Sequence, residues 1–584
     1  MRLSGLGVSP GIGIGKALVL KRGTRDLRFR VSSTRVAREL ERLAEARARS
    51  REQLQQIKQR IARSAGAEHA YLFDAQLLML DDPMLIDRAA EIIATERLNA
   101  GSALELALGE ISALFDQAED AYLRERKGDV GDVVGRLCMN LRASGDPADL
   151  FKLLFQDLEG SLVLVADELT PSVIAQLDWP RLAAIVTDGG SWTDHTAILA
   201  RSIHVPAVAG LRNASALVPP GALLAVDGVI GEVFVEPDAA ALNHVRGRQQ
   251  RRTAYEQSLD EYRRLTPVTQ DDVRIRLEAN VESPDDAVRA REHGAEGIGL
   301  FRSEFLLAGG RQAALTEEAQ YTAYTRLVDS MSPGRVTIRT FDLSEGQLRM
   351  EQAGAAGARA PLGLRGVRLS LATDEVFQPQ LRALLRAAAH GPLRIMFPFV
   401  SGVEELLAAR AAVERAAATL RARGEPAPPV PIGIMIEVPS AALTADLLAE
   451  HADFFSIGTN DLIQYCLAVD RTDDRVSRVY EPLHPAIIRM LRLVARAGRR
   501  RDIPVSVCGE MAADPVLLTL LVGLGLREFS MAPTAIPLAK QILRGLRAGD
   551  AATVAARTLR ARTATEIEKT LLEFVEAGET IKKV

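Results

Sequence analysis

The chain has 584 residues, of which 47% are hydrophobic and 25% are charged, and its formal net charge is -4. This length suffices for roughly three or four domains, and slight acidity with dispersed arginines argues against a nucleic-acid-binding protein. Three scattered cysteines, Cys138, Cys466 and Cys508, exclude a disulfide framework and a cysteine-rich metal cluster.

The N-terminal segment, residues 1–16, has no charged region followed by an apolar core, which a secretory leader requires. No apolar run of about 18 residues occurs later, so no membrane-spanning helix is predicted. We therefore expect a cytoplasmic protein without direct membrane insertion.

Residues 33–143 have the apolar spacing of helices. In the first helix, one apolar stripe is formed by Val36, Leu40, Leu43, Leu54, Ile57 and Ile61. Further helices are predicted over Tyr71–Leu80, Asp87–Glu96, Ala103–Phe115 and Gln117–Leu141. Because an apolar stripe must be covered by partners, these segments predict a helical bundle.

Short apolar runs typical of strands lie on both sides of the bundle. They are Ala17–Leu20, Ser161–Val165, Ala183–Thr187, Pro206–Ala209, Leu223–Val226 and Glu232–Val235. The bundle is therefore predicted to be an insertion into an α/β domain made of residues 1–32 and 144–237. A polar helical stretch, Ala239–Leu265, then fits a linker over residues 238–266.

Residues 267–584 alternate between apolar runs and helical segments. The predicted strands are Val273–Ala279, Gly297–Phe301, Val336–Phe341, Leu393–Phe399, Ile432–Ile436, Phe454–Ile457, Val505–Val507 and Glu528–Met531. The helical segments are Ser283–His293, Val376–Ala389, Val403–Leu420, Ala441–His451, Ala486–Arg500 and Pro515–Gly523. Eight such strands favour a (β/α)₈ barrel over an open doubly wound sheet, which is the alternative architecture.

Several predicted strands end on residues that carry chemistry. These are Arg302 and Glu304, Arg339 and Asp342, Glu437, Asn460 and Asp461, and Cys508, with Arg471 following shortly after the sixth strand. Each one alone is more often structural, but the strand ends of a barrel meet at one mouth. Arginines bind phosphate and carboxylate, and two carboxylates suit Mg²⁺. The pattern predicts a site for a small, highly charged anion and a divalent metal.

A second candidate lies in the N-terminal α/β domain. A predicted strand enters a Gly-Gly turn, and His195 then opens a helix rich in Ala and Leu. The free N–H groups at a helix start would stabilise a phosphate carried on that imidazole, although a lone histidine there is more often structural.

Together the two sites resemble enzyme I of the bacterial sugar phosphotransferase system, the phosphoenolpyruvate–protein phosphotransferase family, over essentially all 584 residues. The matching motifs occur in family order. They are Ser9-Pro-Gly-Ile-Gly-Ile-Gly-Lys-Ala17, Asp167-Glu-Leu-Thr-Pro-Ser172, His195-Thr-Ala-Ile-Leu-Ala-Arg-Ser202, Gly294-Ala-Glu-Gly-Ile-Gly-Leu-Phe-Arg302-Ser-Glu-Phe305, Ile457-Gly-Thr-Asn460-Asp461-Leu-Ile-Gln-Tyr465 and Cys508-Gly-Glu510.

The resemblance implies a multidomain α/β protein, with a phosphohistidine domain that carries the inserted bundle, followed by a (β/α)₈ TIM-type barrel. It implies that His195 is phosphorylated, that Cys508 donates a proton, and that Mg²⁺ is held by Glu437 and Asp461. The residues expected to receive phosphoenolpyruvate are Arg302, Arg339, Asn460, Asp461 and Arg471. The resemblance further implies that the bundle binds the histidine phosphocarrier HPr, that the phosphohistidine domain swings between barrel and carrier, and that the barrel domain forms a homodimer.

The sequence departs from the family in three segments. Trp192 and Asp194 replace an arginine and a small hydroxyl residue before His195, and Asp342–Gln347 lacks a basic residue and adds an acid. The third segment, Ala360–Arg368, lacks an Asn before its Pro. For Asp194 we predict two opposed effects, because its charge supports the His195 imidazole and repels phosphate. An unchanged phosphorylation rate in Asp194→Ser would contradict both.

Two other functions remain open from the sequence. A pyruvate-phosphate dikinase or phosphoenolpyruvate synthase shares both domains but needs an additional nucleotide-binding domain, and no Walker-type loop is present. A non-catalytic regulator that senses phosphoenolpyruvate or binds HPr is supported only by the three departures.

Overall fold

The computed structural model describes residues 1–20, 30–64, 76–77, 79–117, 121–142, 160–167, 181–189, 200, 205–307, 315–344, 348, 362–469, 476 and 479–577. The chain divides into two compact units, Met1–Ala254 and Tyr255–Val584. Within the described ranges, no helix combines the length and apolar character that crossing a membrane demands.

The first unit contains an eight-stranded sheet in the order β1-β8-β7-β3-β4-β5-β6-β2. Its strands are β1 (Arg2–Ser4), β2 (Leu6–Ser9), β3 (Ile12–Leu20), β4 (Leu162–Ala166), β5 (Leu182–Thr187), β6 (Ala207–Ala209), β7 (Leu223–Asp227) and β8 (Glu232–Val235). The sequence predicted six of these strands and missed β1 and β2, which are short and lie among glycines. Glycines also matter inside β3, because a Cβ on Gly13 would lie 2.0 Å from the carbonyl oxygen of Ala183.

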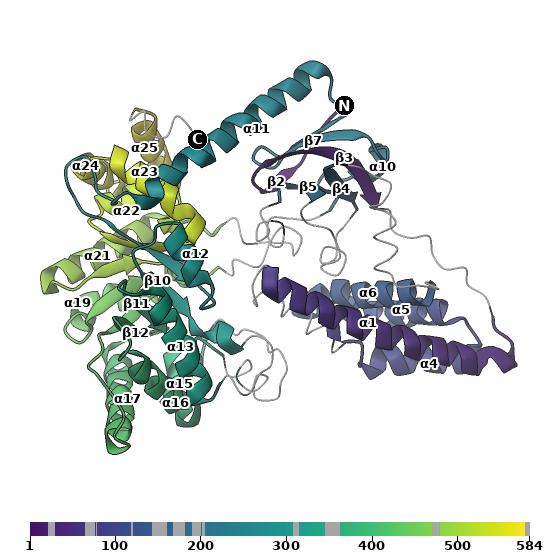
Figure 1. Cartoon of the computed structure of the whole chain (residues 1–584), viewed down its shortest axis with the longest axis horizontal. Helices are drawn as coiled ribbons and strands as arrows, with labels where there is room; N and C mark the ends of the chain where they lie inside the picture. The colour runs from purple at the N-terminus through teal and green to yellow at the C-terminus, as the bar shows by residue number, and fades with distance from the viewer. Residues whose placement is uncertain are drawn as a thin grey trace. The chain divides into compact units, whose positions relative to one another are not determined.

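Strands β3 and β4 are parallel neighbours although the helical segment separates them in the sequence. That segment contains α1 (Val36–Ser64), α4 (Pro83–Glu96), α5 (Ala100–Gln117) and α6 (Ala121–Arg142). Their apolar faces share one buried core, which confirms an inserted helical bundle (Figure 1). Most of the predicted helix Tyr71–Leu80 lies outside the described residues.

The predicted linker helix is α11 (Ala239–Leu259), and a short 3-10 helix over Asp260–Arg264 continues it. The boundary between the two units falls within α11, after Ala254. The exact domain boundaries expected from the sequence remain predictions.

The second unit is a closed barrel of eight parallel strands (Figure 1). They are β9 (Arg276–Val281), β10 (Ile298–Arg302), β11 (Val336–Arg339), β12 (Leu393–Phe397), β13 (Ile432–Ile436), β14 (Phe454–Ile457), β15 (Val505–Val507) and β16 (Glu528–Met531). Because β16 pairs with β9, the sheet closes and the open doubly wound alternative is wrong. The last four predicted strands have the predicted bounds.

Helices surround the barrel and bury its outer apolar surface. They are α12 (Asp286–Glu292), α13 (Glu317–Met331), α15 (Val367–Ala372), α16 (Asp374–Ala387), α17 (Val403–Ala422), α18 (Pro439–Leu443), α19 (Ala445–Leu448), α20 (Thr459–Leu467), α21 (Pro485–Arg501), α22 (Pro515–Gly523), α23 (Ile536–Gly545), α24 (Ala548–Thr558) and α25 (Ala564–Ala577). The single predicted helix Ala441–His451 is wrong, because the non-helical backbone of Thr444 separates α18 from α19.

Four predicted barrel strands are corrected at their ends. The second, predicted over Gly297–Phe301, begins and ends one residue later, as Ile298–Arg302. Val273 precedes β9 because its backbone pairs with Thr269 in a turn. The third strand ends before Phe341, whose N–H donates to Gln380 at 3.2 Å. The fourth ends before Phe399, which follows a proline and has a left-handed φ of 59°. Of these backbone groups, the N–H of Phe399 serves the barrel mouth, where it donates to Glu437 at 2.6 Å.

Candidate active site at the mouth of the barrel

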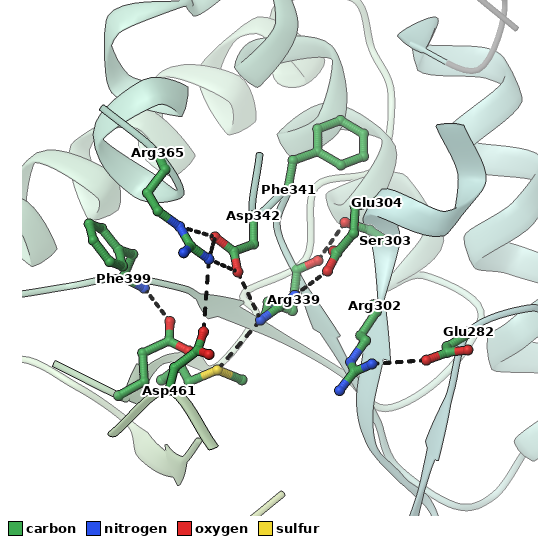
Figure 2. A network of polar contacts seen from close by, with 12 residues as sticks. Glu282, Arg302, Ser303, Glu304, Arg339, Phe341, Asp342, Arg365, Phe399 and Asp461 are labelled. Carbon is green, nitrogen blue, oxygen red and sulfur yellow. Dashed lines mark hydrogen bonds and ion pairs between the residues drawn. The ribbon is translucent and has the colours of Figure 1, made fainter. Parts of the chain in front are cut away.

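The carboxyl ends of the parallel strands bring the described site residues together. Figure 2 shows three of them, Arg302, Arg339 and Asp461. Arg302 and Arg339 are the last residues of β10 and β11, and Glu437 and Cys508 directly follow β13 and β15. Asn460 and Asp461 open α20 after β14. The two remaining predicted residues, His195 and Arg471, lie outside the described residues.

Arg339 is a buried guanidinium surrounded by acids. It contacts the carboxylate of Glu304, and its Nη1 lies 3.3 Å from Asp342 and 3.7 Å from the sulfur of Met435. Burial disfavours its charge, but these carboxylates outweigh burial and raise the pKa of Arg339. Its buried Nε has no hydrogen-bond partner among the described residues. Arg339 is therefore a fixed cation with a donor available to an anion.

Arg365 is a second buried guanidinium, which the sequence analysis did not assign to the site. Its Nη2 donates to both oxygens of Asp342 at 2.9 and 2.8 Å, and its Nη1 donates to the hydroxyl of Tyr465 at 2.8 Å. It also lies 3.8 Å from Asp461 (Figure 2). Arg365 sits in a loop rather than at a strand end, so strand periodicity could not identify it. Asp342 and Arg365, which lie in two of the segments that depart from the family, thus pair with each other.

Arg302 lies closer to the rim than these two arginines. Its Nη1 lies 2.9 Å from Glu282, which follows β9, and both side chains are partly exposed. The neighbouring Ser303 donates from its hydroxyl to the carbonyl oxygen of Arg339 at 2.6 Å, which ties the ends of β10 and β11 together. Arg302 can therefore meet an incoming anion from solvent.

Glu437 is a buried carboxylate held by backbone. Its Oε1 accepts a hydrogen bond from the N–H of Phe399 at 2.6 Å. Burial, followed by the nearby charges of Asp342 and Asp461, raises the pKa of Glu437 to about 8. Carboxylates that repel one another in a dry site are relieved by a cation, so this donor set fits a hard divalent metal.

The described residues contain no cluster of three or more His, Cys, Asp or Glu side chains arranged as a metal site. Glu437 and Asp461 would therefore contribute only part of a coordination sphere. That arrangement suits Mg²⁺, which is usually held by one or two carboxylates while substrate and water oxygens complete the octahedron.

Asn460 is oriented by the segment that follows Cys508. Its Nδ2 donates to Glu510 at 3.0 Å, and its Oδ1 accepts from the N–H of Glu510 at 3.1 Å. The turn between Cys508 and Glu510 requires a glycine, because a Cβ on Gly509 would lie 1.9 Å from the hydroxyl oxygen of Thr459. The amide is thus fixed, with one N–H left for a ligand.

Cys508 lies inside the upper barrel, 4% exposed, in an apolar cluster with Leu300, Met396, Met435 and Phe454. Its thiol lies 3.6 Å from the carbonyl oxygen of Ile457. Burial raises the pKa of this thiol above its usual value. Cys508 therefore stays protonated at neutral pH, as an acid must before it donates.

Three family models match successive parts of the chain. They are the PEP-utilising enzyme, N-terminal, at residues 4–126; the PEP-utilising enzyme, mobile domain, at 158–231; and the PEP-utilising enzyme, PEP-binding domain, at 256–548. The described barrel and its mouth fall within the last of these.

Curated relatives are similar over nearly their full length, and each is named phosphoenolpyruvate-protein phosphotransferase. The Haemophilus influenzae protein is 35% identical, covering 98% of this chain and 99% of its own. The Geobacillus stearothermophilus protein is 39% identical, with 97% and 96% covered, and that of Cupriavidus necator is 39% identical, with 92% and 93% covered.

Proposed function

This chain belongs to the phosphoenolpyruvate–protein phosphotransferase family, and we propose that its barrel mouth binds phosphoenolpyruvate, whose phosphoryl group passes to His195. The chain is a phosphotransferase of the PEP-utilising enzymes and catalyses the first step of the sugar phosphotransferase system. One observation carries the site assignment: buried arginines, two carboxylates and a protonated thiol meet at one end of one barrel.

Phosphoenolpyruvate carries a phosphate and a carboxylate, and both groups suit arginine. Arg302, Arg339 and Arg471 are assigned to these anionic groups with Asn460, and the position of Arg365 adds it to the set. The fixed charge of Arg339 and the fixed amide of Asn460 stabilise charge without rearranging, which makes positioning and electrostatics the main sources of catalysis.

Mg²⁺ is the metal that this donor set favours, with Glu437 and Asp461 as protein ligands. The support is the raised pKa of Glu437, part of which comes from its acidic neighbours. Bound Mg²⁺ would supply positive charge for the phosphoryl and enolate oxygens.

The transfer has two chemical parts. A neutral ring nitrogen of His195 forms a bond to phosphorus while the bond from phosphorus to the enol oxygen breaks, leaving the enolate of pyruvate. The enolate then uses its electron pair to take the thiol proton of Cys508 at its methylene carbon, which gives pyruvate and a thiolate. Water returns a proton to the thiolate. The buried, protonated state of Cys508 supports this role.

The phosphoryl group then passes from His195 to a histidine of HPr. We propose that HPr binds to the inserted helical bundle. Family membership supports this partner, as it supports a homodimer formed through the barrel domain and a cytoplasmic location. Because His195 must receive the phosphoryl group at the barrel mouth and deliver it to HPr, we propose that the phosphohistidine domain swings between them.

Phosphorylation from labelled phosphoenolpyruvate tests the assignment. With Mg²⁺ present, the wild-type chain should retain label and pass it to added HPr, whereas His195→Ala should retain none. Chelation of the metal should abolish labelling of the wild type. A wild-type protein that binds phosphoenolpyruvate but never takes up label would instead be a non-catalytic sensor.

A further inference from the structure

Asn280 lies inside the barrel beside the thiol segment, at the carboxyl end of β9. Its Nδ2 donates to the backbone carbonyl oxygen of Cys508 at 2.9 Å. Its Oδ1 accepts a hydrogen bond from the hydroxyl of Ser530 on β16 at 2.7 Å. The amide therefore spans from β9, across β16, to the residue after β15, and its orientation is fixed because only its nitrogen end can donate to a carbonyl.

Cys508 lies beyond the end of the ladder between β15 and β16. That ladder pairs Ser506 with Glu528 and Val507 with Phe529. Its backbone N–H reaches Ile457 on one side at 3.1 Å. The contact with Asn280 holds the carbonyl, so the backbone that carries the thiol is held by β14 through its N–H and by β9 through its carbonyl oxygen.

We propose that Asn280, oriented by Ser530, is a positioning residue that holds the Cys508 thiol against one face of the enolate. This inference rests on the proposed role of Cys508 as proton donor. In that step the enolate carbon takes the thiol proton and the S–H bond electrons remain on sulfur as a thiolate. A planar enolate has two faces, and a fixed thiol reaches only one of them, whereas water can protonate either.

The stereochemistry of the product therefore reports the position of the thiol. Phosphoenolpyruvate with deuterium at one C3 position, turned over in tritiated water, gives pyruvate with a chiral methyl group when protonation comes from one face. Wild type should give one configuration. Asn280→Leu, which conserves volume and adds no charge, should give a mixture and lower kcat about tenfold with little change in KM, because misplacement of a reacting group by a fraction of an ångström is costly.

Three further variants serve as controls, and they are Gln378→Glu, Ser530→Ala and Cys508→Ala. Gln378→Glu removes a similar contact between a side-chain amide and a backbone carbonyl, at 3.3 Å from Ala412 on the outer helices, and should keep one configuration. Ser530→Ala removes only the orienting hydroxyl and should scramble the methyl group less than Asn280→Leu. It also replaces Asn280→Leu if thermal unfolding shows that the latter does not fold.

Cys508→Ala distinguishes failure of the proposed role of Asn280 from failure of the proposed role of Cys508 as proton donor. Suppose that Cys508→Ala gives a mixture of methyl configurations, whereas folded Asn280→Leu and Ser530→Ala keep the wild-type configuration and kcat. This result would overturn the role of Asn280 and leave that of Cys508 intact. A single configuration retained in Cys508→Ala would show that another group donates the proton, and the proposed function of the thiol would fall with it.

Discussion

Arg365 and Asp342 form a buried ion pair in which one guanidinium nitrogen donates to both carboxylate oxygens, at 2.9 and 2.8 Å. A further bond from Nε to Oδ1 measures 3.2 Å. Asp342 follows β11, whereas Arg365 belongs to a loop before α15, so the pair joins two separate segments of the mouth. Because Tyr465 also accepts from Arg365, the guanidinium is fixed in place by side chains of the protein itself.

We expect Arg365→Lys to weaken both stability and substrate binding. Lysine keeps the charge but cannot present the planar fork that spans both oxygens of Asp342. Removing a partner from a buried pair costs about 3–5 kcal/mol, and a lysine that keeps part of the attraction should cost less. Denaturant unfolding should show the loss, and the KM for phosphoenolpyruvate should rise.

A double variant distinguishes the effect of this ion pair on stability from its effect on substrate binding. Arg365→Met with Asp342→Leu replaces the buried charges by apolar groups and should recover much of the unfolding free energy. Phosphorylation should stay impaired, because no cation has been restored. If the double variant regains normal KM, Arg365 has only a structural role.

Metal affinity should rise with pH, because Glu437 must lose its proton to bind a cation. Its pKa lies near 8 in the folded chain, above an ordinary value of 4.5, so between these values the folded state binds more protons than the unfolded state. The metal-free protein should accordingly lose stability as pH rises through that window. Mg²⁺ binding at pH 7 should release close to one proton, and fewer above pH 8, since metal and proton compete for one group.

Calorimetry in two buffers of different ionisation enthalpy measures that release. Glu437→Gln, which has no proton to lose, is the matched control and should bind Mg²⁺ weakly without proton release. Asp342→Asn removes one of the charges that raise the pKa of Glu437, so it should release less at pH 7 than wild type. Proton release that is the same at pH 7 and pH 9 would contradict the assignment.

The barrel and most of its mouth could be predicted from sequence because both depend on local patterns. Strands buried on both faces appear as short apolar runs, and Cys508 and Glu437 were found simply because each follows such a run. The alternation of runs and helices also predicted closure, which β16 and β9 then confirmed.

Contacts between distant segments could not be predicted in this way. Arg365 and Asp342 meet although they lie 23 positions apart in the sequence, and the segment Ala360–Arg368 was noted only as a departure from the family, not as part of the site. Phe399 was assigned to a strand because it is apolar, yet the proline before it and the carboxylate of Glu437 determine its backbone. Asn280 directly follows the predicted strand Val273–Ala279 and was not assigned to the site, and its partners lie about 230 and 250 positions away.

Truncating the Glu510 side chain should weaken the binding of phosphoenolpyruvate by Asn460. The reciprocal bonds between the two residues orient the Asn460 amide, and only the one from the Glu510 backbone survives in Glu510→Ala. We expect the KM for phosphoenolpyruvate to rise by about tenfold, the equivalent of about 1.4 kcal/mol. Glu510→Gln keeps an acceptor oxygen and should stay close to wild type. Equal KM values for the two variants would mean that Asn460 is oriented by other contacts.

Phe399 offers a test of backbone strain at the mouth. Its left-handed φ of 59° directs its N–H at Glu437, and such a conformation is costly for a bulky residue. Its ring lies 4.9 Å from the guanidinium carbons of both Arg365 and Arg368. Phe399→Leu conserves much of the apolar volume but removes the aromatic face, so phosphoenolpyruvate should bind a few-fold more weakly, consistent with about 0.5–1 kcal/mol per cation–π contact.

Phe399→Ala and Phe399→Gly then isolate the strain itself. Both remove the ring, but glycine adopts a positive φ without a steric penalty, whereas alanine does not. Glycine normally destabilises because it gives the unfolded chain more freedom. At this position we expect the reverse order, with Phe399→Gly more stable than Phe399→Ala by about 1 kcal/mol in denaturant unfolding. If alanine proves the more stable of the two, the left-handed backbone at Phe399 stores no strain and the N–H contact with Glu437 carries no cost.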